Sequence, residues 1–135
     1  MTTISLKRAY EPYAKSDGFR ILVDRLWPRG LKKSTAHIDA WMKEISPSPE
    51  LRMWFNHDPA RWAVFTKAYT AELRKSAVVD ELLACFKKHK KITLLYAARD
   101  EEHNHALVLQ RSINRSLKKI ASGKKAPPLI KSPKK

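Results

Sequence analysis

The chain has 135 residues, with 28 Lys and Arg against 13 Asp and Glu, and therefore carries a formal net charge of +15. Its 43% apolar residues can fill the core of one domain, which argues against a disordered protein. A single cysteine excludes an internal disulfide framework and a cysteine-rich zinc site. Without a long apolar run or a leader-like start, the sequence predicts a cytoplasmic protein that has no membrane partner.

The positive charge has two parts. Residues 118–135 contain seven lysines and no acidic residue, and the first 117 residues keep a formal charge of +8. Lys, Pro, Ser and Gly dominate from residue 122 onward, so we expect a domain at residues 1–121 and a flexible Lys/Pro-rich tail at 122–135. The tail is interpreted either as an electrostatic arm for nucleic acid or as a solvated end that keeps the protein soluble.

Three short apolar segments predict β-strands, at residues 4–7, 19–24 and 92–96. Nearly continuous apolar runs suit strands that are buried on both faces, as in parallel sheets. Helices are predicted from Ser34 or Thr35 through Ile38, Trp41 and Ile45, and from starts at Ser48, at Asp58, near Val79 and near Glu102.

This order of elements predicts a single small α/β domain. We expect a short, mainly parallel sheet of three or four strands, flanked by about five helices. Trp41, Trp54 and Trp62 occupy stripe positions of the predicted helices and are expected in the core.

The loop 24–30, DRLWPRG, directly follows the second predicted strand. Pro28 favours an extended backbone at Trp27, and Gly30 permits a positive φ, so the loop should have a defined shape. Arg25 and Arg29 beside Trp27 predict a grip for phosphate or carboxylate, because guanidinium groups bind planar anions through two hydrogen bonds. The alternative is structural: a buried pair of Asp24 with an arginine, and an indole that fills the core.

A second polar loop, 99–105, joins the last predicted strand to the last helix. If the two strands are parallel neighbours, both loops lie at one edge of the sheet, where open α/β sheets bind ligands. Arg99 then adds positive charge, while Asp24 and His105 become candidate catalytic groups. Asn104 and His57 are candidate ligand-binding residues.

Each of these candidates has a plainer interpretation. The acidic residues Asp100, Glu101 and Glu102 stabilise a helix start and weaken an anion site. Asn104 and His105 are equally typical of helix starts and helix packing. The pair His103 and His105 lacks a third ligand at a recognisable spacing, so we expect no metal. With three glycines the chain has no glycine-rich phosphate loop, and no cofactor is expected.

The segment 16–30, SDGFRILVDRLWPRG, resembles the signature of the bacterial YeaO-like family, a domain-of-unknown-function family numbered 488. Further matching segments are Glu44-Ile45, Pro47-Ser48, Glu50-Leu51-Arg52, the stretch 55–62 with His57-Asp58-Pro59, Phe65, Tyr69, Glu72-Leu73, Leu94-Leu95-Tyr96 and Asn104-His105-Ala106. The resemblance covers about residues 4–117. It implies a compact cytoplasmic α/β domain and assigns no reaction.

The sequence leaves open a structural or adaptor protein whose loops bind another protein, and it favours two other hypotheses. In the first, the protein binds a phosphate-bearing or other anionic ligand at the carboxyl ends of the strands, through Arg25, Arg29 and Arg99, with Asp24 or His105 available for catalysis. In the second, it is a non-catalytic nucleic-acid-binding module that uses its basic body and lysine-rich tail.

Overall fold

The computed structural model describes residues 3–121, so the tail predicted at 122–135 lies outside the described residues. The strands are β1 (Thr3–Arg8), β2 (Phe19–Leu22), β3 (Ala40–Trp41) and β4 (Lys91–Tyr96). They form one sheet in the order β1-β4-β2-β3, and every neighbouring pair is parallel. The predicted α/β class with a short parallel sheet is therefore confirmed.

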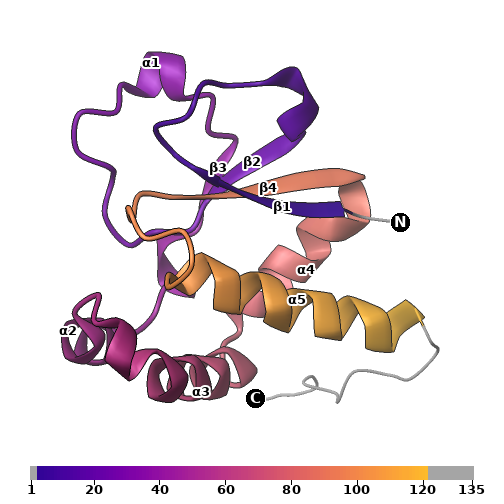
Figure 1. Cartoon of the computed structure of the whole chain (residues 1–135). Coiled ribbons are helices and arrows are strands. Elements are labelled where there is room, and N and C mark those ends of the chain that lie inside the picture. The colour runs from indigo at the N-terminus through magenta and orange to yellow at the C-terminus, as the bar shows by residue number, and fades with distance from the viewer. Residues whose placement is uncertain (1–2, 122–135) are drawn as a thin grey trace.

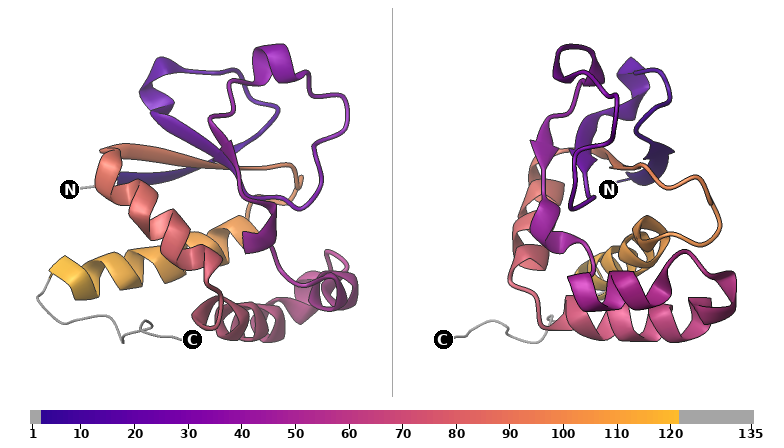
Figure 2. Two further views of the ribbon diagram at one scale, coloured as in Figure 1. Left: turned by 180° about the vertical axis from the view of Figure 1, so that it is seen from behind. Right: turned by 90° about the vertical axis from the view of Figure 1, so that its left-hand side faces the viewer.

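Within residues 3–121, five α-helices and three short 3-10 turns connect and cover the strands. The helices are α1 (Lys33–Ala36), α2 (Pro49–Phe55), α3 (Trp62–Arg74), α4 (Val78–Lys88) and α5 (His105–Ala121), and the turns are η1 (Lys15–Asp17), η2 (Lys43–Ile45) and η3 (Pro59–Arg61). Helices α2 to α5 lie on one side of the sheet, whereas α1 and the long loops lie on the other (Figures 1 and 2).

Side-chain alternation on β2 places apolar groups on both faces of the sheet. Ile21 and Val23 belong to the large core cluster beneath the helices, which also contains Phe65 and Leu109. Leu22 belongs instead to a smaller cluster under the loops. The predicted burial of the strand on both faces is confirmed.

The predicted helix starts at Ser48 and Asp58 are confirmed by their capping bonds. The Ser48 hydroxyl accepts the amide of Leu51 at 3.2 Å, at the start of α2. The Asp58 carboxylate accepts the amide of Ala60 at 3.0 Å, at the start of the η3 turn that leads into α3. Each bond satisfies an amide that would otherwise lack a partner at the first turn.

The prediction of a helix from Ser34 or Thr35 to Ile45 is wrong. Helix α1 has four residues and stops at His37, whose φ is 52°. The chain then extends along β2, where Asp39 exchanges two hydrogen bonds with the backbone of Arg20: its amide donates to the Arg20 carbonyl, and its carboxylate accepts the Arg20 amide. Pairing with the sheet edge overrides the apolar spacing that favoured a helix.

Two of the three tryptophans expected in the core are exposed. Trp41 is 36% exposed and donates its indole N–H to the Asp24 carbonyl at 2.7 Å. Trp54 is 41% exposed, and the Arg61 guanidinium lies over its ring. Trp62 packs against the core as a partly buried side chain. Helical spacing predicted that these side chains face the core. It could not show that Trp41 and Trp54 bind a carbonyl and a guanidinium group at the surface.

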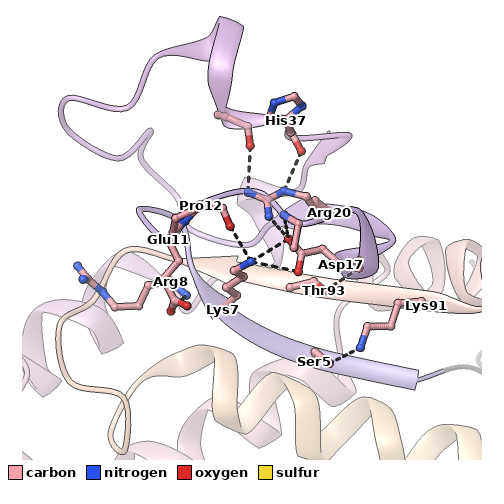
Figure 3. Close-up of polar contacts among 12 residues, drawn as sticks. Ser5, Lys7, Arg8, Glu11, Pro12, Asp17, Arg20, His37, Lys91 and Thr93 are labelled. Carbon is pink, nitrogen blue, oxygen red and sulfur yellow. Dashed lines mark hydrogen bonds and ion pairs between the residues drawn. The ribbon is translucent and has the colours of Figure 1, made fainter.

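A buried arginine, which sequence reasoning did not single out, fixes the loops over the sheet (Figure 3). The side chain of Arg20 is 1% exposed and donates to the carbonyls of Ala36 at 3.0 Å and His37 at 2.9 Å, as well as to the Asp17 carboxylate. Lys7 also donates to Asp17, at 3.0 Å. The guanidinium thus satisfies the last carbonyls of α1 and pairs its own charge.

Candidate functional site

The strand order places β2 beside β4, and both run in the same direction. The loops that follow these strands therefore meet at one edge of the sheet, near the start of α5 and beside α2 (Figure 1). A cavity of about 770 Å³, which we call the arginine pocket, lies between them. Its lining includes all eight candidate residues: Asp24, Arg25, Trp27, Arg29, His57, Arg99, Asn104 and His105.

Asp24 ties the two strand ends to α5. One carboxylate oxygen, Oδ2, accepts the amide of Ala97 at 2.9 Å, just beyond β4. The other, Oδ1, lies 3.1 Å from Nε2 of His105, the first residue of α5. The Asp24 carboxylate is thus half-buried and faces two N–H groups within the fold.

The same ring nitrogen of His105 also lies 3.0 Å from the Val23 carbonyl oxygen. The contact with the carbonyl has hydrogen-bond geometry, whereas Oδ1 of Asp24 is buried and forms no hydrogen bond with the described residues. Both neighbours of Nε2 are acceptors, so this nitrogen carries the proton. Proton transfer to or from a ligand would therefore have to use Nδ1.

Tyr69 lies behind this pair, with its ring centre 6.3 Å from that of His105. Burial raises the pKa of Tyr69 well above its usual value, and the negative charges of Glu72 and Asp24 add to the rise. The hydroxyl therefore stays protonated, and it donates to the Ile45 carbonyl at 2.6 Å. Tyr69 therefore packs in the core behind His105, a residue of the pocket lining.

Arg25 is the cation placed deepest in the loop after β2. Its Nε atom is buried and has no hydrogen-bond partner among the described residues, and one terminal nitrogen reaches the Pro47 carbonyl only at 3.5 Å. No carboxylate of residues 3–121 forms an ion pair with it. A half-buried guanidinium in this state has unused donors beside the cavity.

Three more arginines line the pocket: Arg29, Arg52 and Arg99. All three side chains are exposed, and within the described part of the chain none forms an ion pair with a carboxylate. Arg52 was missed as a site residue by sequence reasoning. Its spacing of three from the buried Phe55 was the available signal, because both then lie on one side of α2.

The acidic residues before α5 leave the pocket largely cationic. Only Asp100 lines the cavity, and Glu101 and Glu102 do not. Hydrogen bonds from the Glu102 amide and from His103 hold the pKa of the Asp100 carboxyl below its usual value. The carboxylate is ionised, but it already accepts these hydrogen bonds. Of the three acidic residues that were expected to weaken an anion site, only Asp100 lines the cavity.

Asn104 also lines the pocket, yet it uses its side chain to begin α5. Its Oδ1 accepts the amide of Leu107 at 3.1 Å, and its Nδ2 donates to the Asp100 carbonyl at 2.9 Å. This cap places the helix start after Asn104, three residues beyond the predicted start at Glu102.

The loop after β2 holds its tryptophan in a fixed position. The Trp27 indole donates to the Leu31 carbonyl at 2.7 Å, and its ring meets the edge of Trp41 at 5.5 Å between centroids. Gly30 has a φ of 80°, as predicted from its place in the turn. Trp27 therefore lines the pocket with an indole whose N–H already donates to the Leu31 carbonyl.

His57 reaches the pocket from the end of α2 through an unusual backbone. Asn56 and His57 both have positive φ angles, 46° and 55°, although neither is glycine. Left-handed residues of this kind cost on the order of 1 kcal/mol each. The exposed His57 ring lies 6.2 Å from Phe55, at the side of the cavity.

Apolar side chains complete the pocket. Phe55 and Phe65 stack at 4.2 Å between ring centres, and both line the cavity together with Pro47 and the alanines Ala97 and Ala98. The cavity is thus apolar on one side and carries four arginines elsewhere.

Among residues 3–121, no three His, Cys, Asp or Glu side chains gather in a way that would hold a metal ion. The same part of the chain contains no helix with the length and apolarity needed to cross a membrane.

Comparison with known proteins gives the relatives of this chain. Residues 3–130 match the family described as "Inactive DUF488-N3 subclade", so the match extends into the segment predicted as a tail. The chain is 49% identical to the uncharacterized protein YeaO of Escherichia coli K12 over 106 residues, or 78% of this chain and 92% of that one. It is 37% identical over 113 residues to the uncharacterized protein Mb3100c of Mycobacterium bovis, covering 84% and 95% of the two chains. No solved structure matches the chain.

Proposed function

The chain belongs to the YeaO-like family, within DUF488, and from this premise we propose that it binds a small organic anion in the arginine pocket. The observation that carries this proposal is the state of Arg25. Its buried Nε lacks a partner in the described structure, and its charge is not balanced by an ion pair there. A buried donor without a partner costs about 1–3 kcal/mol, which a bound anion would recover.

The remaining arginines support an anion rather than a neutral ligand. Arg29, Arg52 and Arg99 surround the same cavity, whereas the two carboxylates of its lining, Asp24 and Asp100, already accept hydrogen bonds. Guanidinium groups bind the oxygens of phosphate and carboxylate in a fixed fork geometry. Phosphate and carboxylate ligands share this chemistry, since each presents the negatively charged oxygens of a tetrahedral or planar anion.

The size and lining of the pocket support an apolar body on the ligand. A volume of about 770 Å³ falls in the range of sites for drug-sized molecules. The stacked rings of Phe55 and Phe65 provide the apolar wall. The ligand class is therefore an aromatic or aliphatic group that carries one phosphate or carboxylate.

Binding without turnover fits this chain better than catalysis. The family that it matches is described as inactive. Asp24 and His105, the two candidate catalytic groups, are engaged in joining β2, β4 and α5. We therefore assign them a structural role in shaping the pocket.

Thermal unfolding with defined probes tests the proposal. Phenyl phosphate and benzoate should raise the unfolding temperature, inorganic phosphate should do so more weakly, and phenol should have no effect. Comparison of the first two probes distinguishes a preference for phosphate from one for carboxylate. No stabilisation by either aromatic anion would overturn the proposal.

Matched arginine variants locate the effect. Arg25→Gln and the exposed Arg99→Gln should each weaken phenyl phosphate binding by about tenfold or more, as expected for a lost hydrogen bond to a charged group. Arg111→Gln removes the same charge on α5, outside the pocket lining, and should leave the affinity unchanged. Equal losses in all three variants would show a general charge effect and contradict the assignment.

A further inference from the structure

A second cavity, of about 560 Å³, lies between the end of α3, the start of α4 and the second half of α5. We call it the α3–α5 groove. It shares no lining residue with the arginine pocket. His105, the first residue of α5, lines the pocket, whereas Ser112 and Lys119 of the same helix line the groove, so the two cavities lie toward opposite ends of α5. Figure 1 shows the course of this helix.

The residues of 3–121 that line the groove include four cations and one carboxylate. The cations are Arg74, Lys75, Arg115 and Lys119, and the carboxylate is Asp80. Within residues 3–121, neither Arg74 nor Lys75 has an ion-pair partner. Arg115 donates only to the Arg111 carbonyl, at 3.5 Å. The charges of Arg74, Lys75 and Arg115 are therefore not balanced by an ion pair within the described residues.

Residues with hydroxyl groups line the groove together with these cations. Ser76, two residues before α4, accepts the Val78 amide at 3.2 Å. The Oγ atom of Ser112 is buried and has no hydrogen-bond partner among the described residues. A buried hydroxyl without a hydrogen-bond partner destabilises the fold, and a ligand in the groove could supply that partner. Ser116 adds another donor one turn further along α5.

The composition of the lining favours the phosphate backbone of nucleic acid. Arg, Lys, Ser and Thr side chains are among the groups that form hydrogen bonds with phosphate and sugar in such complexes. Among the described residues, the lining of the groove includes no aromatic side chain, so it offers no platform for the bases of a single strand. A duplex, whose phosphates are outside and whose bases are stacked inside, is the better match.

The sequence around the groove points in the same direction. Residues 103–135 contain no acidic residue, and Lys119 belongs both to the groove and to the lysine-rich segment 118–135. We propose that the α3–α5 groove binds the phosphate backbone of duplex nucleic acid without sequence preference. This inference does not depend on the arginine pocket or its ligand.

The salt dependence of duplex binding tests the inference. Fluorescence anisotropy of the full chain with a labelled DNA duplex, at several salt concentrations, gives the log–log slope. The double variant Arg74→Gln/Arg115→Gln should reduce this slope by about 0.9 for each arginine lost. Both side chains are exposed, so the variant should fold, which thermal unfolding checks.

A charge-matched control separates the groove from the net charge. Lys15→Gln/Lys32→Gln removes two exposed lysines near η1 and α1, on the loop side of the sheet (Figure 1). It should leave the slope unchanged, as should Arg99→Gln in the arginine pocket. An equal reduction by the control, or no duplex binding by the parent, would overturn the inference.

The alternative polyanion is an acidic membrane surface. The same variants should be tested for sedimentation with vesicles of phosphatidylcholine and phosphatidylserine. If the groove variant loses vesicle binding but keeps its affinity for the duplex, the proposed partner is wrong. Failure of the phenyl phosphate experiment would leave the duplex result unaffected, because the two sites share no residue.

Discussion

Nε2 of His105 lies 3.1 Å from Oδ1 of Asp24, and this contact joins the first residue of α5 to the loop after β2. Because Oδ2 of the same carboxylate accepts the Ala97 amide, one side chain connects three segments at the edge of the sheet. The arrangement fixes the relative positions of the two loops that carry Arg25 and Arg99. The pocket thus depends on Asp24, although Asp24 need not touch the ligand.

Asp24→Asn should destabilise the fold by about 1–3 kcal/mol. The two carboxylate oxygens face two N–H groups, those of Ala97 and His105, and an amide supplies only one acceptor for them. Whichever way the amide turns, one donor meets another. Urea unfolding measures the loss. The half-exposed Asp58→Asn is the control and should cost less than about 1 kcal/mol, because its cap to Ala60 survives the change.

Arg20→Lys should destabilise the fold by about 3 kcal/mol even though the charge is kept. A lysine cannot reach the carbonyls of Ala36 and His37 together with the Asp17 carboxylate, so buried acceptors lose their partners. Chemical unfolding compares this variant with Arg111→Lys, an exposed arginine on α5 that should tolerate the change. Equal stability of the two variants would refute the role given to Arg20.

The Asp17 carboxyl should make the protein sensitive to acid. Burial acts to raise its pKa, but hydrogen bonds from Lys7, the Ala14 amide and Arg20 outweigh it and hold the pKa below the usual 3.8. Its contribution to stability is therefore present above pH 3.8 and is lost as the pH falls through the lower folded pKa.

Urea unfolding of the parent and of Asp17→Asn across this acid range measures that contribution. The stability difference between the two proteins should shrink as the pH falls below 3.8. A difference that stays constant down to about pH 2 would contradict the paired state of this carboxyl.

The two left-handed residues after α2 provide a matched pair for His57. Glycine at either position relieves backbone strain and loses chain entropy, so Asn56→Gly and His57→Gly should each change stability by no more than about 1 kcal/mol. Only His57→Gly removes a side chain from the pocket lining. Titration with phenyl phosphate should therefore show weaker binding for that variant alone, and similar affinities would exclude His57 from the site.

The sequence predicted the pocket well because its signals are local. Apolar runs marked β2 and β4, and polar residues directly followed each run, so a parallel pairing was enough to bring Arg25, Arg99 and His105 to one edge. The caps at Ser48 and Asp58 were equally local, and the structure confirms them.

The errors concern contacts between distant segments. Trp41 lies on an edge strand because Arg20 and Asp39 bond across the sheet, and no spacing within residues 34–45 could show this. The buried position of Arg20 was hidden for the same reason, since its partners come from η1 and α1. Arg52 was overlooked because it enters the pocket from α2, which follows neither strand directly.

Chemical-shift mapping by two-dimensional NMR tests the central claim, that the arginine pocket binds an organic anion, most directly. Phenyl phosphate added to the labelled full chain should shift the amide signals of residues 24–29 and 97–105, the loops that form the pocket. Shifts confined to residues 74–80 and 112–119 in the α3–α5 groove, or the absence of any saturable shift, would contradict the claim.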